Sequence, residues 1–243
     1  MATTVQVNRF STEKDLQEEV CKLIAQKSTL SIEDHGFFTI ALSGGSSAKI
    51  VCSGLTHQAI DFSKWKVLFC DERYVPLSDE NSNYKLAKEF LLDKTSISEE
   101  NVVALNPSLS LEESAKDYEQ KLKSLHPKST GVPSLDLLVL GMGPDGHICS
   151  LFPGHSLLDE TDQLVASLAD SPKPPPCRIT LTYPVINNAK CAVFVTTGSS
   201  KAEMVQRALE GNEENPVPAA RVKLLNGHVY WFLDDGSASL LKK

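Results

Sequence analysis

The sequence predicts an α/β protein built on a doubly wound, mainly parallel sheet with flanking helices on both faces, a modified Rossmann-like fold. Two observations lead to this prediction. Short apolar runs typical of strands alternate along the chain with longer amphipathic runs typical of helices. The runs that end at Leu140 and Thr197 are almost continuously apolar, as in strands buried on both faces of a parallel sheet. A length of 243 residues suits one large domain, 1–243, with room for a small appended subdomain.

The predicted elements follow one another in a regular order. A strand at residues 5–10 precedes an amphipathic helix that Thr12 and Asp15 cap and that runs to about residue 27. Further strands are predicted at residues 37–42, 65–70, 102–105, 135–140, 191–197 and 229–233. Further helices are predicted from residue 47 to 60 and at residues 84–92, 111–125 and 199–210. A short helix should follow His147 until Pro153 stops it, and the proline-rich residues 171–176 should form an exposed loop.

The composition limits the classes of partner. With 24 Lys and Arg against 31 Asp and Glu, the formal net charge of −7 provides no basic surface for nucleic acid or for an acidic membrane. No apolar stretch is long enough to span a bilayer and no secretory segment is evident, so we expect a cytoplasmic location. The six cysteines are scattered without a C-x-x-C pair, which favours free thiols in a reducing compartment over disulfides or a zinc site.

A glycine-rich turn follows the strand at residues 37–42. Ligands of open α/β sheets bind beyond the carboxyl ends of the strands, so residues placed there are candidates for function. The turn consists of Ser43, Gly44, Gly45 and Ser46, and a helix follows it. Glycines allow a tight turn that exposes backbone amides, and the helix N-terminus favours an anion. The turn therefore predicts a phosphate site, with a plain flexible turn and a serine N-cap as the alternative.

Charged residues stand at the ends of three other predicted strands or extended segments. Asp71 and Arg73 come directly after an apolar strand, which carries them to the edge where clefts form; an exposed turn with local salt bridges is the alternative. Arg178 begins a segment that alternates with period two. Lys201 lies in the first turn of a predicted helix, where the helix dipole disfavours a cation and a nearby phosphate would favour one. Ordinary surface charges are the alternative for Arg178 and Lys201.

The turn after residue 140 combines an acid with a histidine. His147 titrates near neutrality and is the natural general base, while Asp145 either orients its imidazole or shapes the turn. Residues 141–146 also match G-x-G-x-x-G, the dinucleotide fingerprint. Asp145 would repel a pyrophosphate, and Pro153 stops the helix that the fingerprint needs, so we favour neither a nicotinamide nor a flavin cofactor. No histidine pair has metal-ligand spacing, and no metal is expected.

Five segments together resemble a known family. They are ALSGGSS at 41–47, CDERYVPLSDENSNY at 70–84, LGMGPDGHICSLFPGH at 140–155, RITLTYPVI at 178–186 and TTGSSKAE at 196–203. In this order they are similar to the 6-phosphogluconolactonase family, in the superfamily that also contains glucosamine-6-phosphate deaminases. One departure is Ala48, where the family more usually has a proline; this loosens the helix start without removing an amide donor.

The resemblance implies a role for each candidate residue. It implies that the sugar phosphate is held by the Ser43–Ser46 turn with Arg178 and Lys201, that Asp71 belongs to the substrate site, and that Arg73 faces the lactone carbonyl. His147 would be the base that activates water for hydrolysis of 6-phosphoglucono-δ-lactone to 6-phosphogluconate. The resemblance implies no cofactor and a small-molecule partner, and we favour a monomer.

Two alternatives remain at this stage. The deaminase branch continues its histidine segment with Phe-Asn-Glu-Pro, whereas this chain has Ser150-Leu151-Phe152-Pro153, which favours the lactonase over a deaminase or sugar-phosphate isomerase. A non-catalytic sugar-phosphate sensor would keep the phosphate ligands but lose the base or the oxyanion cation. Because His147 and Arg73 are both present, an enzyme is the preferred interpretation.

Overall fold

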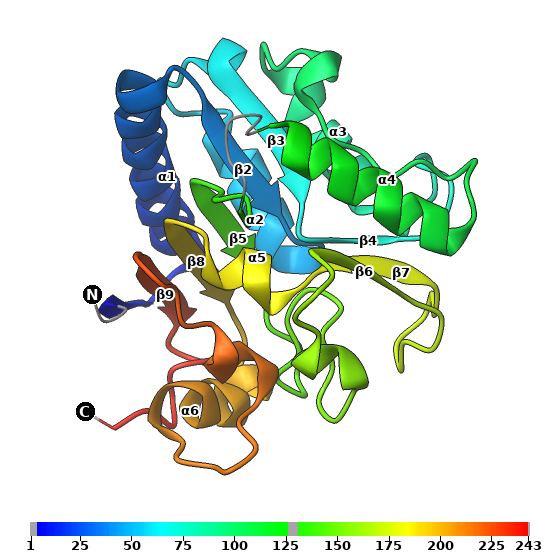
Figure 1. The fold of residues 1–243 in the computed structure, drawn as a ribbon. Coiled ribbons are helices and arrows are strands. Elements are labelled where there is room, and N and C mark those ends of the chain that lie inside the picture. Colours follow the sequence, from blue (N-terminus) through cyan, green and yellow to red (C-terminus); the bar gives the residue numbers. More distant parts are fainter. Residues whose placement is uncertain (1–3, 126–130, 243) are drawn as a thin grey trace.

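The computed structural model describes residues 4–125 and 131–242 and contains a six-stranded sheet in the order β1-β9-β8-β5-β2-β3 (Figure 1). All neighbouring strands in this sheet are parallel. The strands are β1 (Thr4–Phe10), β2 (Phe38–Leu42), β3 (Trp65–Phe69), β5 (Leu137–Leu140), β8 (Cys191–Thr196) and β9 (His228–Asp234). The predicted mainly parallel sheet is confirmed.

Helices cover both faces of this sheet, as the doubly wound prediction requires (Figure 1). One face packs against α1 (Glu13–His35), α2 (Gly45–Leu55) and α3 (Asn83–Phe90). The other packs against α4 (Leu111–Ser124), α5 (Tyr183–Asn187) and α6 (Ala202–Glu210). In β8, Val193 lies in the first core and Phe194 in the second, because successive strand residues point to opposite faces. Both faces are therefore apolar, which explains the continuously apolar strands.

A second, antiparallel sheet of three strands lies beside the main one in the order β4-β7-β6. Its strands are β4 (Asp71–Arg73), β6 (Val165–Leu168) and β7 (Arg178–Leu181). The sequence did not reveal β6. Where β4 forms, it predicted the end of the preceding strand, with an exposed turn as the alternative. The register pairs Arg73 with Arg178 and Asp71 with Thr180, so this sheet brings charged residues far apart in the sequence side by side.

Four local predictions need correction. The strand expected at residues 102–105 is only an isolated bridge between Val102 and Val67. The helix expected after His147 does not form: residues 141–155 make turns, and the positive φ values of Gly146 (83°), Cys149 (50°) and Gly154 (73°) are incompatible with a continuous helix. Lys201 ends a 3₁₀ turn and is the N-cap of α6. The first helix continues past residue 27 to His35, where Gly36 ends it in a left-handed conformation.

The remaining short elements are 3₁₀ helices, and the proline-rich segment is a loop. The 3₁₀ helices are Phe62–Lys64, Leu92–Lys94, Glu99–Asn101, Ser156–Asp159, Ser199–Lys201 and Pro218–Arg221. Residues 171–176 have no regular structure, and their Pro172, Pro174 and Pro176 are exposed while Ser171 is buried. Within the described parts of the chain, every helix is too short or too polar to cross a bilayer.

A buried carboxylate joins strands at the edge opposite to the candidate site. The Asp136 side chain accepts hydrogen bonds from the backbone N–H of Thr39 at 2.9 Å and from its hydroxyl at 2.8 Å. Lys190 Nζ lies 2.9 Å from the other carboxylate oxygen, and His35 Nε2 lies 3.0 Å from it. Burial acts to raise the pKa of Asp136, but Lys190 and Thr39 outweigh burial and lower it.

We expect Asp136→Asn to lower the free energy of unfolding by about 2 kcal/mol at neutral pH, the scale of hydrogen bonds to a charged group. Because the pKa is lowered in the folded state, the carboxylate stabilises the protein above the ordinary Asp pKa, and this contribution is lost as the pH falls through the folded value. Urea denaturation at several pH values measures the difference in the free energy of unfolding between the variant and the wild type. This difference should become smaller in acid. Asp235→Asn, at an exposed position, is the control.

Candidate active site

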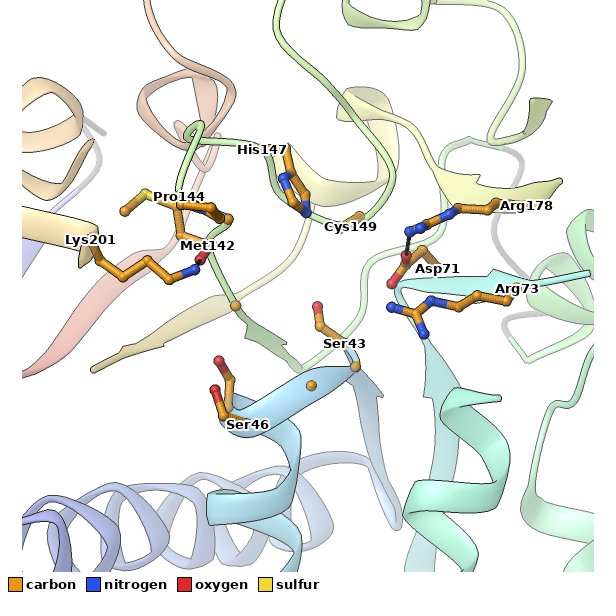
Figure 2. A pocket seen from close by; sticks show the side chains of 15 residues that line it. Ser43, Ser46, Asp71, Arg73, Met142, Pro144, His147, Cys149, Arg178 and Lys201 are labelled. Carbon is orange, nitrogen blue, oxygen red and sulfur yellow. Dashed lines mark hydrogen bonds and ion pairs between the residues drawn. The ribbon is translucent and has the colours of Figure 1, made fainter. Parts of the chain in front are cut away.

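The loops at the carboxyl edge of the main sheet enclose a polar pocket with a volume of about 210 Å³ (Figure 2). Its walls come from the ends of β2, β3, β5 and β8 and from the small sheet. The lining residues are Ser43, Gly44, Gly45, Ser46, Ser47, Asp71, Arg73, Gly141, Met142, Gly143, Pro144, His147, Cys149, Arg178 and Lys201. Every residue predicted for the site is among them except Asp145, which contacts His147 instead.

The glycine turn presents the amino end of α2 to the pocket. Gly44 is the N-cap of this helix, and within the described residues no side chain hydrogen-bonds to its first amides. The Ser43 hydroxyl is buried and has no hydrogen-bond partner in the described part of the protein. A Cβ on Gly44 would lie 2.1 Å from Asn83 Oδ1, so glycine is required where the turn passes α3. The serine N-cap considered as an alternative is wrong, and the free amides form a site suited to an anion.

His147 and Asp145 form a hydrogen-bonded pair on the turn after β5. Nδ1 of His147 lies 2.5 Å from Asp145 Oδ1, and the imidazole packs against Phe152 with 4.6 Å between ring centroids. Burial lowers the pKa of His147, and the hydrogen bond and charge of Asp145 oppose this change. Burial acts to raise the pKa of Asp145, but His147 outweighs it and the pKa is lowered. An ionised Asp145 therefore accepts a hydrogen bond from Nδ1–H, and Nε2 of the neutral imidazole remains free to act as a base.

Gly143 makes this pair possible. A Cβ at this position would lie 2.0 Å from His147 Nδ1 and 2.5 Å from Asp145 Oδ1. We expect Gly143→Ala to displace the imidazole. For a reaction in which His147 is the base, kcat should fall by about 100-fold, because a displacement of about 1 Å can have that effect. Gly131→Ala is the matched control, since no atom of the described residues beyond its chain neighbours lies within 4 Å of a Cβ placed there. Steady-state kinetics measures the effect, and thermal melts show whether the variant is folded. A folded Gly143→Ala protein with wild-type kcat would contradict the prediction.

Two cations reach the pocket from opposite sides. Arg73 donates from Nη1 to Asn81 O at 2.7 Å, and its buried Nε has no partner among the described residues. Lys201 donates from Nζ to Met142 O at 2.5 Å. Burial lowers the pKa of Lys201, and the charge of Asp145 opposes this change. Both side chains line the pocket and retain donors that a bound anion or a carbonyl oxygen can use.

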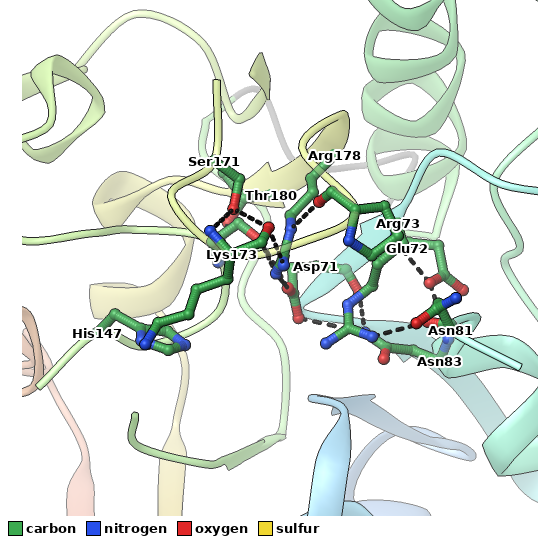
Figure 3. Close-up of polar contacts among 12 residues, drawn as sticks. Asp71, Glu72, Arg73, Asn81, Asn83, His147, Ser171, Lys173, Arg178 and Thr180 are labelled. Atoms are coloured by element: carbon green, nitrogen blue, oxygen red, sulfur yellow. Dashed lines mark hydrogen bonds and ion pairs between the residues drawn. The ribbon is translucent and has the colours of Figure 1, made fainter. Parts of the chain in front are cut away.

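Arg178 is buried and has its own partners in the chain (Figure 3). Its Nε donates to Pro175 O at 2.9 Å, and its Nη2 donates to Lys173 O at 2.9 Å and to Pro174 O at 3.2 Å. Its Nη1 donates to Ser150 Oγ at 3.3 Å and lies 3.9 Å from Asp71 Oδ2. The predicted phosphate contact of Arg178 stays a prediction, and the structure adds that this guanidinium holds the proline-rich loop.

Two residues that shape the site, Glu72 and Cys149, received no role from the sequence. Glu72 is buried and accepts hydrogen bonds from the backbone N–H groups of Arg73, Asn83 and Tyr84, which anchors β4 to the start of α3. Burial raises the pKa of Glu72, and these amides oppose it. Cys149 lines the pocket with a positive φ of 50°. No local pattern marks Cys149, because its position depends on the fold of the turn.

Among residues 4–125 and 131–242, no group of three or more His, Cys, Asp or Glu side chains has the arrangement of a metal site. The side chains that line the pocket are instead mainly cations and hydroxyls, together with one histidine, one carboxylate (Asp71) and one thiol (Cys149). The fold and this pocket define an α/β protein of the class that binds a small anionic ligand beyond the strand ends of a parallel sheet.

Comparison with known proteins identifies the family. A family model described as glucosamine-6-phosphate isomerases/6-phosphogluconolactonase matches residues 11–231. The chain is 43% identical over 241 residues to the 6-phosphogluconolactonase of Bos taurus, which covers 97% of this chain and 93% of that protein. It is 44% identical over 231 residues to the probable 6-phosphogluconolactonase of Schizosaccharomyces pombe, which covers 90% of each chain. The chain belongs to the glucosamine-6-phosphate isomerase/6-phosphogluconolactonase family.

Solved structures agree with this result. The 6-phosphogluconolactonase of Trypanosoma brucei superposes with a TM-score of 0.88 at 26% identity over 100% of both chains. A monomeric glucosamine-6-phosphate deaminase superposes with a TM-score of 0.80 at 24% identity, covering 97% of this chain and 100% of that chain. The second likeness shows that the fold is shared by both branches of the family, so the choice between their reactions depends on the residues in the pocket.

Proposed function

We propose that this chain hydrolyses 6-phosphoglucono-δ-lactone to 6-phosphogluconate, a step of the oxidative pentose phosphate pathway. The observation that carries the proposal is that His147, paired with Asp145, lines the same pocket as Arg73 and the open amino end of α2. The Bos taurus relative, at 43% identity, is named for this reaction. Hydrolysis of a phosphorylated lactone needs a base to activate water, a cation to stabilise the oxyanion and an anion site to bind the phosphate.

In the proposed reaction, His147 Nε2 removes a proton from a water molecule, and the water oxygen forms a bond to the lactone carbonyl carbon. The carbonyl oxygen gains negative charge, and Arg73 stabilises it. When the tetrahedral intermediate collapses, the bond between that carbon and the ring oxygen breaks. The His147 imidazolium returns its proton to the ring oxygen, which becomes the hydroxyl group of the open product. The base is thereby regenerated, and the scheme uses no cofactor.

The phosphate of the substrate would lie between the α2 amides and Lys201. The α2 amides are not capped by any described side chain, and Lys201 Nζ is held toward the pocket by Met142 O. Arg178 and Asp71 complete the proposed substrate site from the small sheet. Binding energy from the phosphate, remote from the reacting ester, would fix the carbonyl between His147 and Arg73.

A glucosamine-6-phosphate deaminase is the competing enzyme. In the deaminase branch, the glutamate of the segment Phe-Asn-Glu-Pro completes the acid–base set. The corresponding segment of this chain begins with Ser150, whose hydroxyl donates to Asp71 Oδ2 at 2.7 Å. The next three residues, Leu151-Phe152-Pro153, carry no carboxylate. This absence favours the lactonase.

The decisive experiment measures formation of 6-phosphogluconate from freshly prepared lactone, with the spontaneous rate subtracted, in parallel with ammonia release from glucosamine-6-phosphate. The expected result is saturable lactone turnover above the uncatalysed rate and no ammonia. Ammonia release without lactone turnover would replace the proposal with the deaminase. Tight binding of 6-phosphogluconate with no turnover of either substrate would replace it with a sensor.

We also propose that the protein is a cytoplasmic monomer. All six thiols are free and five of them are buried, which supports a reducing compartment. Light scattering during size-exclusion chromatography measures the mass in solution, and 26.5 kDa is the value expected for a monomer.

A further inference from the structure

The proline-rich loop at residues 171–176 brings a further cation to the catalytic pair (Figure 3). The side chain of Lys173 extends from this loop toward His147, and its Nζ lies 3.7 Å from Asp145 Oδ2. Asp145 uses its other oxygen, Oδ1, for the hydrogen bond to His147. One carboxylate therefore lies between an ammonium group and the imidazole.

Hydrogen bonds from Arg178 and Ser171 fix the loop that carries Lys173. Arg178 donates to three successive carbonyl oxygens of the loop, those of residues 173, 174 and 175. The buried Ser171 adds a hydrogen bond from its hydroxyl to Lys173 O at 2.8 Å, and Lys173 N donates to that hydroxyl at 3.2 Å. Ser171 N also donates to Pro176 O at 3.1 Å, which closes the base of the loop. The backbone of Lys173 is thus fixed relative to the pocket.

We propose that Lys173 is a positioning residue for the His147 base: it holds Asp145 by the carboxylate oxygen that does not contact the imidazole and keeps the imidazole neutral at working pH. This role rests on the proposed lactone hydrolysis. It also gives Arg178 a function, since the buried guanidinium sets the place of the loop from which Lys173 reaches Asp145. The resemblance of the sequence to the family assigned neither role.

The charges around His147 have opposite effects on its pKa. Asp145 on the same turn and Asp71 on β4 stabilise the protonated imidazole, and Lys173 destabilises it. The cations that line the pocket itself are Arg73 on β4, Arg178 on β7 and Lys201 before α6. Among all four cations, Lys173 is the one paired with the carboxylate that His147 uses, so its removal should release Asp145 to favour the imidazolium more strongly.

The test compares Lys173→Met, which removes the charge, with Lys173→Arg, which keeps it. Lys223→Met, on an exposed lysine, is the matched control. The Lys173 and Asp145 side chains are 41% and 34% exposed, so loss of this pair should leave the fold intact. The first readout is the pKa of His147 in the free protein, from NMR titration of the imidazole signals, with His147→Gln used to assign them. The second is the pH dependence of kcat and KM for the lactone.

We expect Lys173→Met to raise the pKa of His147 by about 0.2–0.7 pH unit, the scale of a half-exposed charge interaction. The acidic limb of kcat/KM should move upward by the same amount, because the base must be neutral, and Lys173→Arg and Lys223→Met should match the wild type. An unchanged His147 pKa in Lys173→Met would overturn the proposal. A large rise in KM with an unchanged pKa would also overturn it and make Lys173 a substrate ligand.

The NMR readout separates this proposal from the proposed function. If the wild-type protein fails to hydrolyse the lactone, the proposed function is wrong whatever the titration shows. If the wild type hydrolyses it and Lys173→Met leaves both the pKa and the pH profile unchanged, only the role of Lys173 is wrong.

Discussion

Replacement of His147 by alanine is expected to lower kcat for lactone hydrolysis by about 10²–10⁴-fold, the usual contribution of a positioned general base. Among the described residues that line the pocket, His147 is the one histidine; burial lowers its pKa, which favours the neutral ring, and Nδ1 is already bonded to Asp145. Without Nε2, water must attack the lactone without a proton acceptor in place. KM should change much less, because the proposed phosphate site lies on other segments.

The measurement is initial-rate kinetics with the spontaneous opening of the lactone subtracted at every concentration. His57→Ala, a change at an exposed histidine outside the pocket, is the matched control. Asp145→Asn should give an intermediate loss, because the ring would remain but its orientation and its tautomer would no longer be set. A folded His147→Ala protein with wild-type kcat would exclude this residue as the base.

Replacement of Arg73 by methionine is expected to lower kcat by about 10²–10³-fold, which corresponds to roughly 3–4 kcal/mol of transition-state stabilisation. The Arg73 side chain lines the pocket, and Asn81 O fixes the orientation of its Nη1. The guanidinium donors that face the pocket can therefore stabilise the charge that develops on the carbonyl oxygen. Because the charge is greatest in the transition state, the loss should fall mainly on kcat.

Arg73→Lys tests the geometry of this contribution. Lysine keeps the positive charge but not the planar arrangement of donors, so partial activity is expected. Arg9→Met, at an exposed position on β1, is the control for loss of an arginine charge. An Arg73→Met variant that raises KM tenfold at unchanged kcat would show that Arg73 binds the ground state of the substrate.

Most of the strands and the placement of the functional groups were predictable from local pattern. The apolar runs before Ser43, Asp71 and Gly141 form β2, β3 and β5, and their carboxyl ends lie at the edge where the pocket forms. A run that is apolar at every position can be buried only if both faces are covered, which is why the doubly wound sheet followed from the sequence. The candidate residues gathered because parallel strands direct all their carboxyl ends to one edge.

Two local errors have a common cause. The helix expected after His147 is replaced by turns through Gly146 and Cys149, whose positive φ values depend on contacts made by the folded turn. β6 was missed because its partner β7 lies ten residues further along the chain, across the proline-rich loop. Period and composition report which face of an element is buried, but they carry little information about pairing between distant segments.

The sequence by itself determined the sheet class, the strand ends that bear reactive groups and the family, because these follow from periodicity and from short ordered motifs. Only the tertiary structure decided which groups pair. In the fold, Asp145 hydrogen-bonds to His147, Arg178 donates to the proline-rich loop, and Lys173 pairs with Asp145. A hydrogen bond requires donor and acceptor within about 3.5 Å and an ion pair requires them within about 4 Å. The backbone positions that set such distances arise when separate segments pack together.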